Sequence, residues 1–185
     1  MKNLILYISL TLLANCLIAQ EFIGVAASHK LITPAVKTTS SACPNGNEQT
    51  VSDNETFEKE LVELINLERA SVGAPPVKLV NELTYSSRFH SKDMADQDYF
   101  SHNSASGCTT FDRISAFYTY LSAGENIASG FSNPETVHQG FINSPPHYST
   151  MINASYNEVG VGYSYNTQAS GQTRWVENFG SRQGI

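Results

Sequence analysis

Basic residues are scarce in this sequence, whose 185 residues include 11 Lys and Arg against 17 Asp and Glu, for a formal net charge of −6. A protein that binds nucleic acid neutralises phosphates with clustered Lys and Arg, and the sequence contains no such cluster. It therefore argues against a nucleic-acid partner. With 41% hydrophobic residues, the chain suits one globular domain plus a tail.

Long apolar runs are lacking except at the N-terminus, where residues 4–13 are mostly apolar and follow Lys2. This pattern, with the small Ala19 ahead of Gln20, predicts a signal peptide over residues 1–19. The run is shorter than a membrane-spanning helix needs and is interrupted by polar residues, which disfavours an uncleaved anchor. We therefore expect a mature chain that is secreted or held at the cell surface, without a transmembrane span.

Cysteine is rare as well. Cys16 lies in the predicted signal peptide, where it leaves a lipid anchor open as an alternative, and Cys43 and Cys108 remain after cleavage. Two cysteines in an exported chain predict one disulfide, with two free thiols as the alternative. A Cys43–Cys108 disulfide would tie the N-terminal tail to the loop after His102.

Two local signatures of catalysis are missing. The sequence has no His-Glu-x-x-His helix, which marks many zinc proteases, and no Gly-x-Ser-x-Gly turn, which presents a nucleophilic serine. A serine triad built from Ser144 or Ser149 with His147 therefore rests on closeness in sequence alone. A site of another kind would have to be assembled from distant segments.

A tail over residues 20–51, rich in Thr, Ser, Pro and Asn, predicts a loosely ordered arm ahead of one domain over residues 52–185. Ser52 and Glu55 have the spacing of a capping box at the first helix, and Ser144-Pro145-Pro146 is expected to end the last one. Periodicity and turn signals predict helices over 52–72, 81–98, 109–117 and 133–142, and strands over 124–130, 159–165 and 174–179.

Two further patterns concern packing. Gly160 and Gly162 leave one face of their strand nearly bare, which would let a neighbouring element approach closely. His90 shares a helix face with Leu83 and Met94, so we expect a hydrogen-bonded core histidine there.

Glu125 places one carboxylate in an otherwise small and apolar run, Ala123 to Ser129. A buried carboxylate is costly unless it is paired or ligates a metal. Because Glu125 lies almost midway in sequence between His102 and His147, we expect the fold to bring the three side chains to one cleft. Two imidazoles and a carboxylate are ligands for Zn²⁺ or another divalent cation. The alternative, which spacing alone favours, is a strand carboxylate held by backbone N–H groups.

Four motifs occur in order along the chain, at Tyr99–Ser104, Gly124–Ala128, Asn143–Tyr148 and Val159–Tyr163. In that order they resemble the CAP superfamily of cysteine-rich secretory proteins, antigen 5 and pathogenesis-related proteins, and most of all its bacterial-type single-domain members. The resemblance covers about residues 57–180. It implies an α+β fold, a three-layer α-β-α sandwich with a small antiparallel sheet.

The resemblance also implies a central cleft, lined by two His and two Glu, that can bind a divalent metal. His102, Glu125 and His147 match three of these positions, whereas Ser144 stands at the second Glu and cannot supply its charge. The residues expected to line the cleft beside the metal ligands are Ser144, Asn126 and Tyr148. The missing carboxylate puts tight metal binding in doubt.

Family membership fixes fold better than function, so three hypotheses stay open. The first is a secreted binding module for a lipid-like or other small apolar ligand, or for an envelope or host partner. The second is a metal-assisted hydrolase in which His102, Glu125 and His147 serve a metal-bound water. The third is a structural cell-envelope protein whose polar residues only specify the fold. Binding ranks first, and whether the chain is an enzyme remains undecided.

Overall fold

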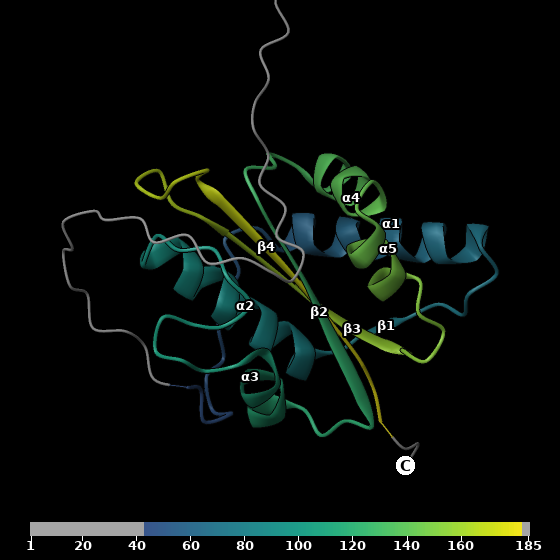
Figure 1. Cartoon of the computed structure of the whole chain (residues 1–185), viewed down its shortest axis with the longest axis horizontal. Coiled ribbons are helices and arrows are strands. Elements are labelled where there is room, and N and C mark those ends of the chain that lie inside the picture. Colours follow the sequence, from purple (N-terminus) through teal and green to yellow (C-terminus); the bar gives the residue numbers. More distant parts are fainter. Residues whose placement is uncertain (1–42, 183–185) are drawn as a thin grey trace, which may run out of the picture.

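Figure 1 shows the computed structural model, which describes residues 43–182. The predicted signal peptide, residues 1–19, and all but the end of the predicted arm, residues 20–51, lie outside the described part. Within that part, no helix combines the length and apolarity that crossing a membrane requires. The helices are α1 (Glu55–Ser71), α2 (Asn81–Asp96), α3 (Thr110–Phe117), α4 (Pro134–Ile142) and α5 (Pro145–Met151), and the strands are β1 (Lys78–Leu79), β2 (Ser122–Ser129), β3 (Glu158–Tyr165) and β4 (Thr173–Ser181).

The four strands form one sheet in the order β1-β3-β4-β2, so β2 lies at an edge. β4 pairs antiparallel with β3 and β2, whereas β1 pairs parallel with β3. The predicted α+β class is confirmed. The sheet is mixed instead of purely antiparallel because of β1, whose two residues are too few to give a periodic signal in the sequence.

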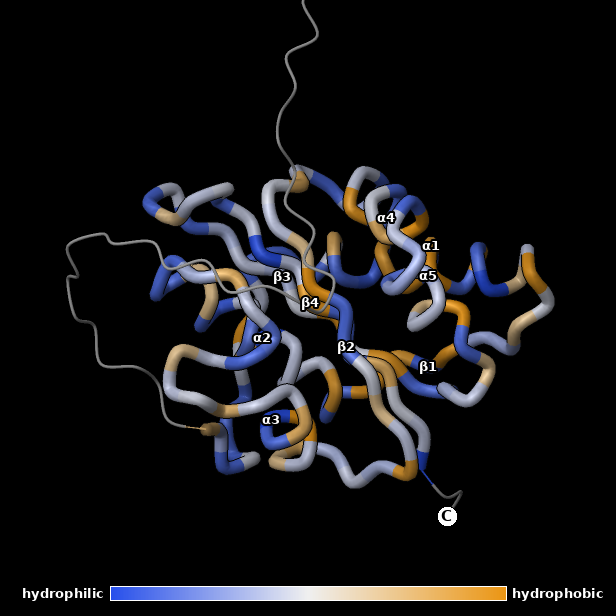
Figure 2. The backbone as a smooth tube through the Cα atoms, viewed as in Figure 1, coloured by the Kyte–Doolittle hydropathy of each residue, from blue (hydrophilic) through white to orange (hydrophobic). Residues whose placement is uncertain are grey.

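Helices cover both faces of this sheet, as the predicted three-layer sandwich requires (Figure 1). α1, α4 and α5 pack on the face that carries Trp175 and Phe179, and their contacts enclose the largest apolar cluster. α2 and α3 pack on the other face, where Leu83 and Met94 belong to two smaller apolar clusters. Figure 2 shows the apolar segments of the strands and of α1 and α4 gathered toward the middle of the fold.

The helix ends explain where the sequence-based boundaries were right and wrong. α1 is capped by Asn54, whose side chain accepts from the Phe57 amide at 3.2 Å, so the predicted Ser52 capping box is wrong. Thr109 caps α3 in a capping box, and Asn133 caps α4. The predicted stop at Ser144-Pro145-Pro146 instead starts α5, because proline suits the first turn of a helix.

Gly160 and Gly162 of β3 face α2, and the predicted close approach is confirmed. A Cβ at Gly162 would lie 2.3 Å from the Ser87 carbonyl carbon, and one at Gly160 would lie 2.1 Å from that of Leu83. The bare strand face therefore lets the α2 backbone lie against the sheet. His90, on the same helix, is fully buried and its Nε2 lies 2.9 Å from the Ser101 carbonyl oxygen, as expected for a core histidine.

Candidate functional site

Glu125 is the centre of a closed network on the face of β2 that α2 and α3 cover, and its side chain is 1% exposed. Arg113 Nη2 donates to Oε1 and Oε2 at 3.1 and 3.0 Å, and Thr110 Oγ1 donates to Oε1 at 2.8 Å. His102 Nδ1 lies 3.0 Å from Oε1. With its amide nitrogen turned toward the site, Asn178 donates to Oε2 at 3.1 Å. These partners are side chains, which argues against the interpretation that backbone amides hold the carboxylate.

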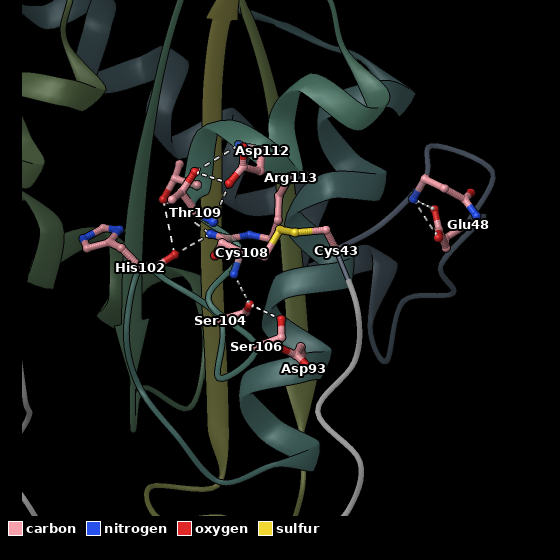
Figure 3. The surroundings of a disulfide bond; sticks show 12 residues. Cys43, Glu48, Asp93, His102, Ser104, Ser106, Cys108, Thr109, Asp112 and Arg113 are labelled. Atoms are coloured by element: carbon pink, nitrogen blue, oxygen red, sulfur yellow. Dashed lines mark hydrogen bonds between the residues drawn. A yellow bond between two sulfur atoms is a disulfide. The ribbon is translucent and has the colours of Figure 1, made fainter.

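Arg113, which the sequence interpretation missed, joins this network to the loop before α3. Its side chain is fully buried, and Nη2 also donates to the His102 carbonyl oxygen at 2.7 Å. Nη1 donates to the Cys108 carbonyl oxygen at 3.1 Å, as Figure 3 shows beside the disulfide. A buried cation therefore fixes both the carboxylate and the loop that carries the exposed histidine.

The charge state of Glu125 follows from these partners. Burial by itself would raise the pKa of this carboxyl, but His90, the hydrogen bond with His102 and the Arg113 guanidinium together lower the pKa to about 2. Glu125 is therefore a carboxylate at neutral pH, and a carboxylate can only accept hydrogen bonds. His102 Nδ1 must then be the protonated nitrogen, which leaves the lone pair of the neutral ring on Nε2. The His102 side chain is 29% exposed, so it is the member of the network that reaches solvent.

His147 lies on the other side of β2, in α5. Successive strand residues point to opposite faces, so Asn126 faces α5 while Glu125 faces α3. The Asn126 amide donates to the His147 carbonyl oxygen at 3.0 Å, and His147 Nδ1 lies 2.8 Å from Ser144 Oγ. Burial, and secondarily the charge of His102, lower the pKa of His147 to about 4. The two imidazoles therefore interact electrostatically across the edge strand β2.

The other candidate residues of the cleft are held by contacts with neighbouring helices. Asn126 is 1% exposed, so it supports α5 from within. Tyr148 donates its hydroxyl to Glu68 Oε1 of α1 at 2.7 Å. His138 of α4 is buried, and His29 lies outside the described residues.

The predicted metal site can be tested against the donors present. Within residues 43–182, the only three or more His, Cys, Asp or Glu ligand atoms that all lie within 4.8 Å of one another belong to Cys43, Cys108 and Asp112. The Glu125 oxygens are already engaged, and a divalent cation on them would face the buried Arg113 guanidinium. The predicted set of His102, Glu125 and His147 is not such a group. The donors left for a cation are the imidazoles of His102 and His147, with Glu125 orienting His102 in the way that carboxylates orient zinc-bound histidines. That assignment stays a prediction.

The predicted disulfide is confirmed: Cys43 and Cys108 are bonded, across 65 positions of sequence. Figure 3 shows the bond next to the start of α3 and one residue from its Thr109 cap. Because Arg113 also holds the Cys108 carbonyl oxygen, the disulfide braces the same loop as the Glu125 network.

The profile of the CAP family, described as the cysteine-rich secretory protein family, matches residues 62–179, and the chain belongs to this family. Over 108 residues it is 40% identical to the uncharacterised protein YkwD of Bacillus subtilis (strain 168), a match that spans 58% of this chain and 42% of YkwD.

Two solved structures resemble the fold. One is an extracellular protein containing a SCP domain from Bacillus anthracis str. Ames, with 28% identity and a TM-score of 0.62, covering 69% of this chain and 41% of that one. The other is an outer surface protein of Borrelia burgdorferi, with 21% identity and a TM-score of 0.64, covering 72% of this chain and 97% of that one. The second likeness shows the fold alone. The chain spans less than half the length of YkwD and of the Bacillus anthracis protein.

Proposed function

We propose that this chain is a secreted CAP-family binding module in which His102 is the polar contact for the ligand. The observation that carries the proposal is the closed network around Glu125. The Glu125 carboxylate and the Arg113 guanidinium are buried and paired with each other, whereas His102 is partly exposed and hydrogen-bonded to the carboxylate. A fixed, partly exposed imidazole on a buried ionic support suits recognition, because it contacts a ligand without first losing conformational entropy.

The same network disfavours a hydrolase that uses Glu125 as a base. An effective general base has a pKa near the working pH and a path to the proton that it takes. Glu125 has a pKa of about 2, and side-chain donors occupy both oxygens. The metal-assisted hydrolase is therefore the weaker candidate, and a purely structural envelope role is the other alternative.

The ligand that we propose is a small apolar or lipid-like molecule or an envelope or host partner, with Zn²⁺ or another divalent cation as a cofactor on His102 and His147. Exposed apolar side chains support the apolar part of this proposal. Phe111, directly after Thr110 in α3, is 52% exposed, and Leu121, just before β2, is 70% exposed. The Tyr120 ring lies 6.3 Å from that of Phe111.

Three observations support an extracellular location. The N-terminal sequence has the pattern of a signal peptide. The Cys43–Cys108 disulfide is of the kind that persists in oxidising compartments. The Bacillus anthracis protein with a similar SCP domain is described as extracellular.

Zinc titration by calorimetry tests the cofactor part of the proposal. The mature protein is compared with the His102→Ala/His147→Ala double variant, and with His29→Ala as a control that removes an imidazole elsewhere. We expect saturable binding by the wild type and the control, and a loss of at least about tenfold in affinity in the double variant. Equal binding by the double variant, or none by the wild type, would overturn the assignment of the metal to these two residues.

A further inference from the structure

Glu177 is a second buried carboxyl group in the sheet, and the network around Glu125 does not use it. It lies in β4 and is fully buried. Its cross-strand partners are Asn126 of β2 and Val161 of β3, and Val161 belongs to the apolar cluster under α1, α4 and α5. Glu177 therefore points to the α5 face of the sheet, away from Arg113.

The contacts of Glu177 leave two acceptors without a donor. Asn126 Nδ2 donates to Glu177 Oε2 at 3.0 Å and to the His147 carbonyl oxygen at 3.0 Å. The other oxygen of each side chain, Asn126 Oδ1 and Glu177 Oε1, is buried and has no hydrogen-bond partner among the described residues. The amide orientation is not in question, because a carbonyl oxygen can only accept and so must face the nitrogen.

One proton on Glu177 satisfies both oxygens. Buried polar atoms are almost always paired, and leaving two acceptors unpaired in an apolar layer is costly. A neutral carboxylic acid has one O–H donor and one carbonyl acceptor, and a carboxamide has the same pair of functions. An acid and an amide can therefore pair edge to edge, with the amide N–H donating to the acid oxygen and the acid O–H donating to the amide oxygen.

We propose that Glu177 keeps its proton at neutral pH and forms a two-hydrogen-bond acid–amide pair with Asn126, which positions His147 through its backbone. Glu177 is then a positioning residue, since it acts on the site only through Asn126. The pair itself stands on the geometry of β2 and β4. Its use in ligand binding rests on the proposed function of His102 and His147.

The surroundings of Glu177 agree with a neutral acid. Burial raises the pKa of this carboxyl to about 8, and the hydrogen bond from Asn126 lowers it only in part. Within the described part of the chain, no cation or imidazole hydrogen-bonds Glu177. The buried ionisable side chains that the elements of this layer carry are Glu58 and Arg69 of α1, His138 of α4, His147 of α5 and Tyr163 of β3.

The Glu177→Gln variant tests the pair, because glutamine offers the same donor and acceptor at every pH. In the wild type, the unfolded carboxyl loses its proton near pH 4.5 and the folded one near pH 8, so stability falls as pH rises between these values. Glu177→Gln lacks this decline. We expect the Tm of the variant, relative to wild type, to rise from pH 4.5 to about 8 and then to level off.

The control and a direct readout make this test decisive. Glu63→Gln removes an exposed carboxylate of α1 and should follow the wild-type pH profile. Isotope-edited infrared spectra of glutamate-labelled protein at neutral pH should show the carbonyl stretch of a protonated carboxylic acid, lost in Glu177→Gln. Parallel Tm profiles for wild type and Glu177→Gln, or the absence of that band, would overturn the pair.

The positioning role has its own readout. Zinc affinity should be kept in Glu177→Gln and fall by about tenfold in Glu177→Leu, which cannot hold the Asn126 amide. Equal affinities in the two variants would overturn the positioning role. Because the infrared band does not depend on zinc, failure of the wild type to bind zinc would count against the proposed function and leave the acid–amide pair to be judged separately.

Discussion

Two carboxyl groups on neighbouring strands are buried to a similar extent, yet the side chains around them shift their pKa values in opposite directions. His90, the hydrogen bond with His102 and the guanidinium of Arg113 lower the pKa of Glu125 to about 2. Glu177 faces an apolar layer with a single amide, and burial raises its pKa to about 8. Desolvation raises the pKa of both groups, so the partners of Glu125 account for the difference: His90, the hydrogen bond with His102 and the Arg113 guanidinium.

The first prediction at this scale concerns Glu125→Gln. Replacing the carboxylate leaves Arg113 buried without its counter-ion, which should lower the free energy of unfolding by about 3 kcal/mol at neutral pH. Because the pKa of Glu125 is lowered in the folded state, its contribution is present above pH 4.5 and is lost as pH falls toward 2. Urea denaturation of both proteins across this range should show the difference shrinking with acidity.

Glu63→Gln is the matched control for that measurement. Glu63 is an exposed carboxylate of α1, and its replacement should change the stability by about 0.5 kcal/mol or less. A Glu125→Gln protein as stable as this control would contradict the ionic pairing described for Arg113.

Only some residues of this site could be predicted from the sequence. His102 and Glu125 were assigned from short motifs, and the structure places them in contact. Arg113 was missed because a charged residue on a short amphipathic helix looks like a solvent-facing one until the neighbouring strand is known. Its only sequence signal is its place beside Ile114, one turn after the capping Thr109. Glu177 was missed because a charged residue in a strand also looks solvent-facing, although β4 is buried on both faces.

At the scale of elements, the edge strand β2 organises the site. Its alternation sends Glu125 to α3 and Asn126 to α5, so histidines from two layers approach one strand from opposite faces. The sequence predicted this strand but did not predict α5. The proline pair predicts a helix stop, but Pro145 and Pro146 instead lie in the first turn of α5, where proline costs no hydrogen bond.

The glycines of β3 carry the prediction at this scale. In Gly162→Ala the new Cβ would lie 2.3 Å from a backbone carbon of α2, which the helix can relieve only by moving off the sheet. We expect a loss of about 3 kcal/mol, at the upper end of overpacking costs. Thermal unfolding of the purified variant measures this loss.

Gly124→Ala provides the comparison, because its nearest neighbour is the hydroxyl at the far end of the Tyr156 side chain, at 2.6 Å. A flexible side chain can turn away, so we expect a loss of about 1 kcal/mol. A Gly162→Ala protein no less stable than Gly124→Ala would show that the contact between α2 and β3 is not tight.

At the scale of the whole molecule, local hydrophobic patterns determine the helices and strands. The site depends on pairing between strands that are far apart in the sequence. Alternation in β3 and the helical stripes can be recognised in the sequence because each is local. The register that sets Asn126 opposite Glu177 has no local signal, since it depends on strands 51 positions apart. The disulfide was predictable because only two cysteines remain after the predicted signal peptide is removed.

The observations at the three scales agree on one description of the molecule. An extracellular-type CAP domain braces one loop with a disulfide and a buried arginine, and presents His102 from that loop. The second histidine is held from the opposite face through Asn126. The binding that we propose at the two imidazoles depends on His102 keeping its orientation, which its hydrogen bond to Glu125 fixes.

The protonation of the His102 ring tests this account most directly. Nitrogen NMR of protein labelled in histidine, with His102→Ala used to assign the signals, can be recorded at about pH 8, above the ordinary histidine pKa of about 6.5. We predict that the neutral form of the His102 ring has its hydrogen on Nδ1, facing Glu125, and its lone pair on Nε2. A ring with its hydrogen on Nε2 would contradict the account, because it could not donate to the carboxylate that is said to hold it.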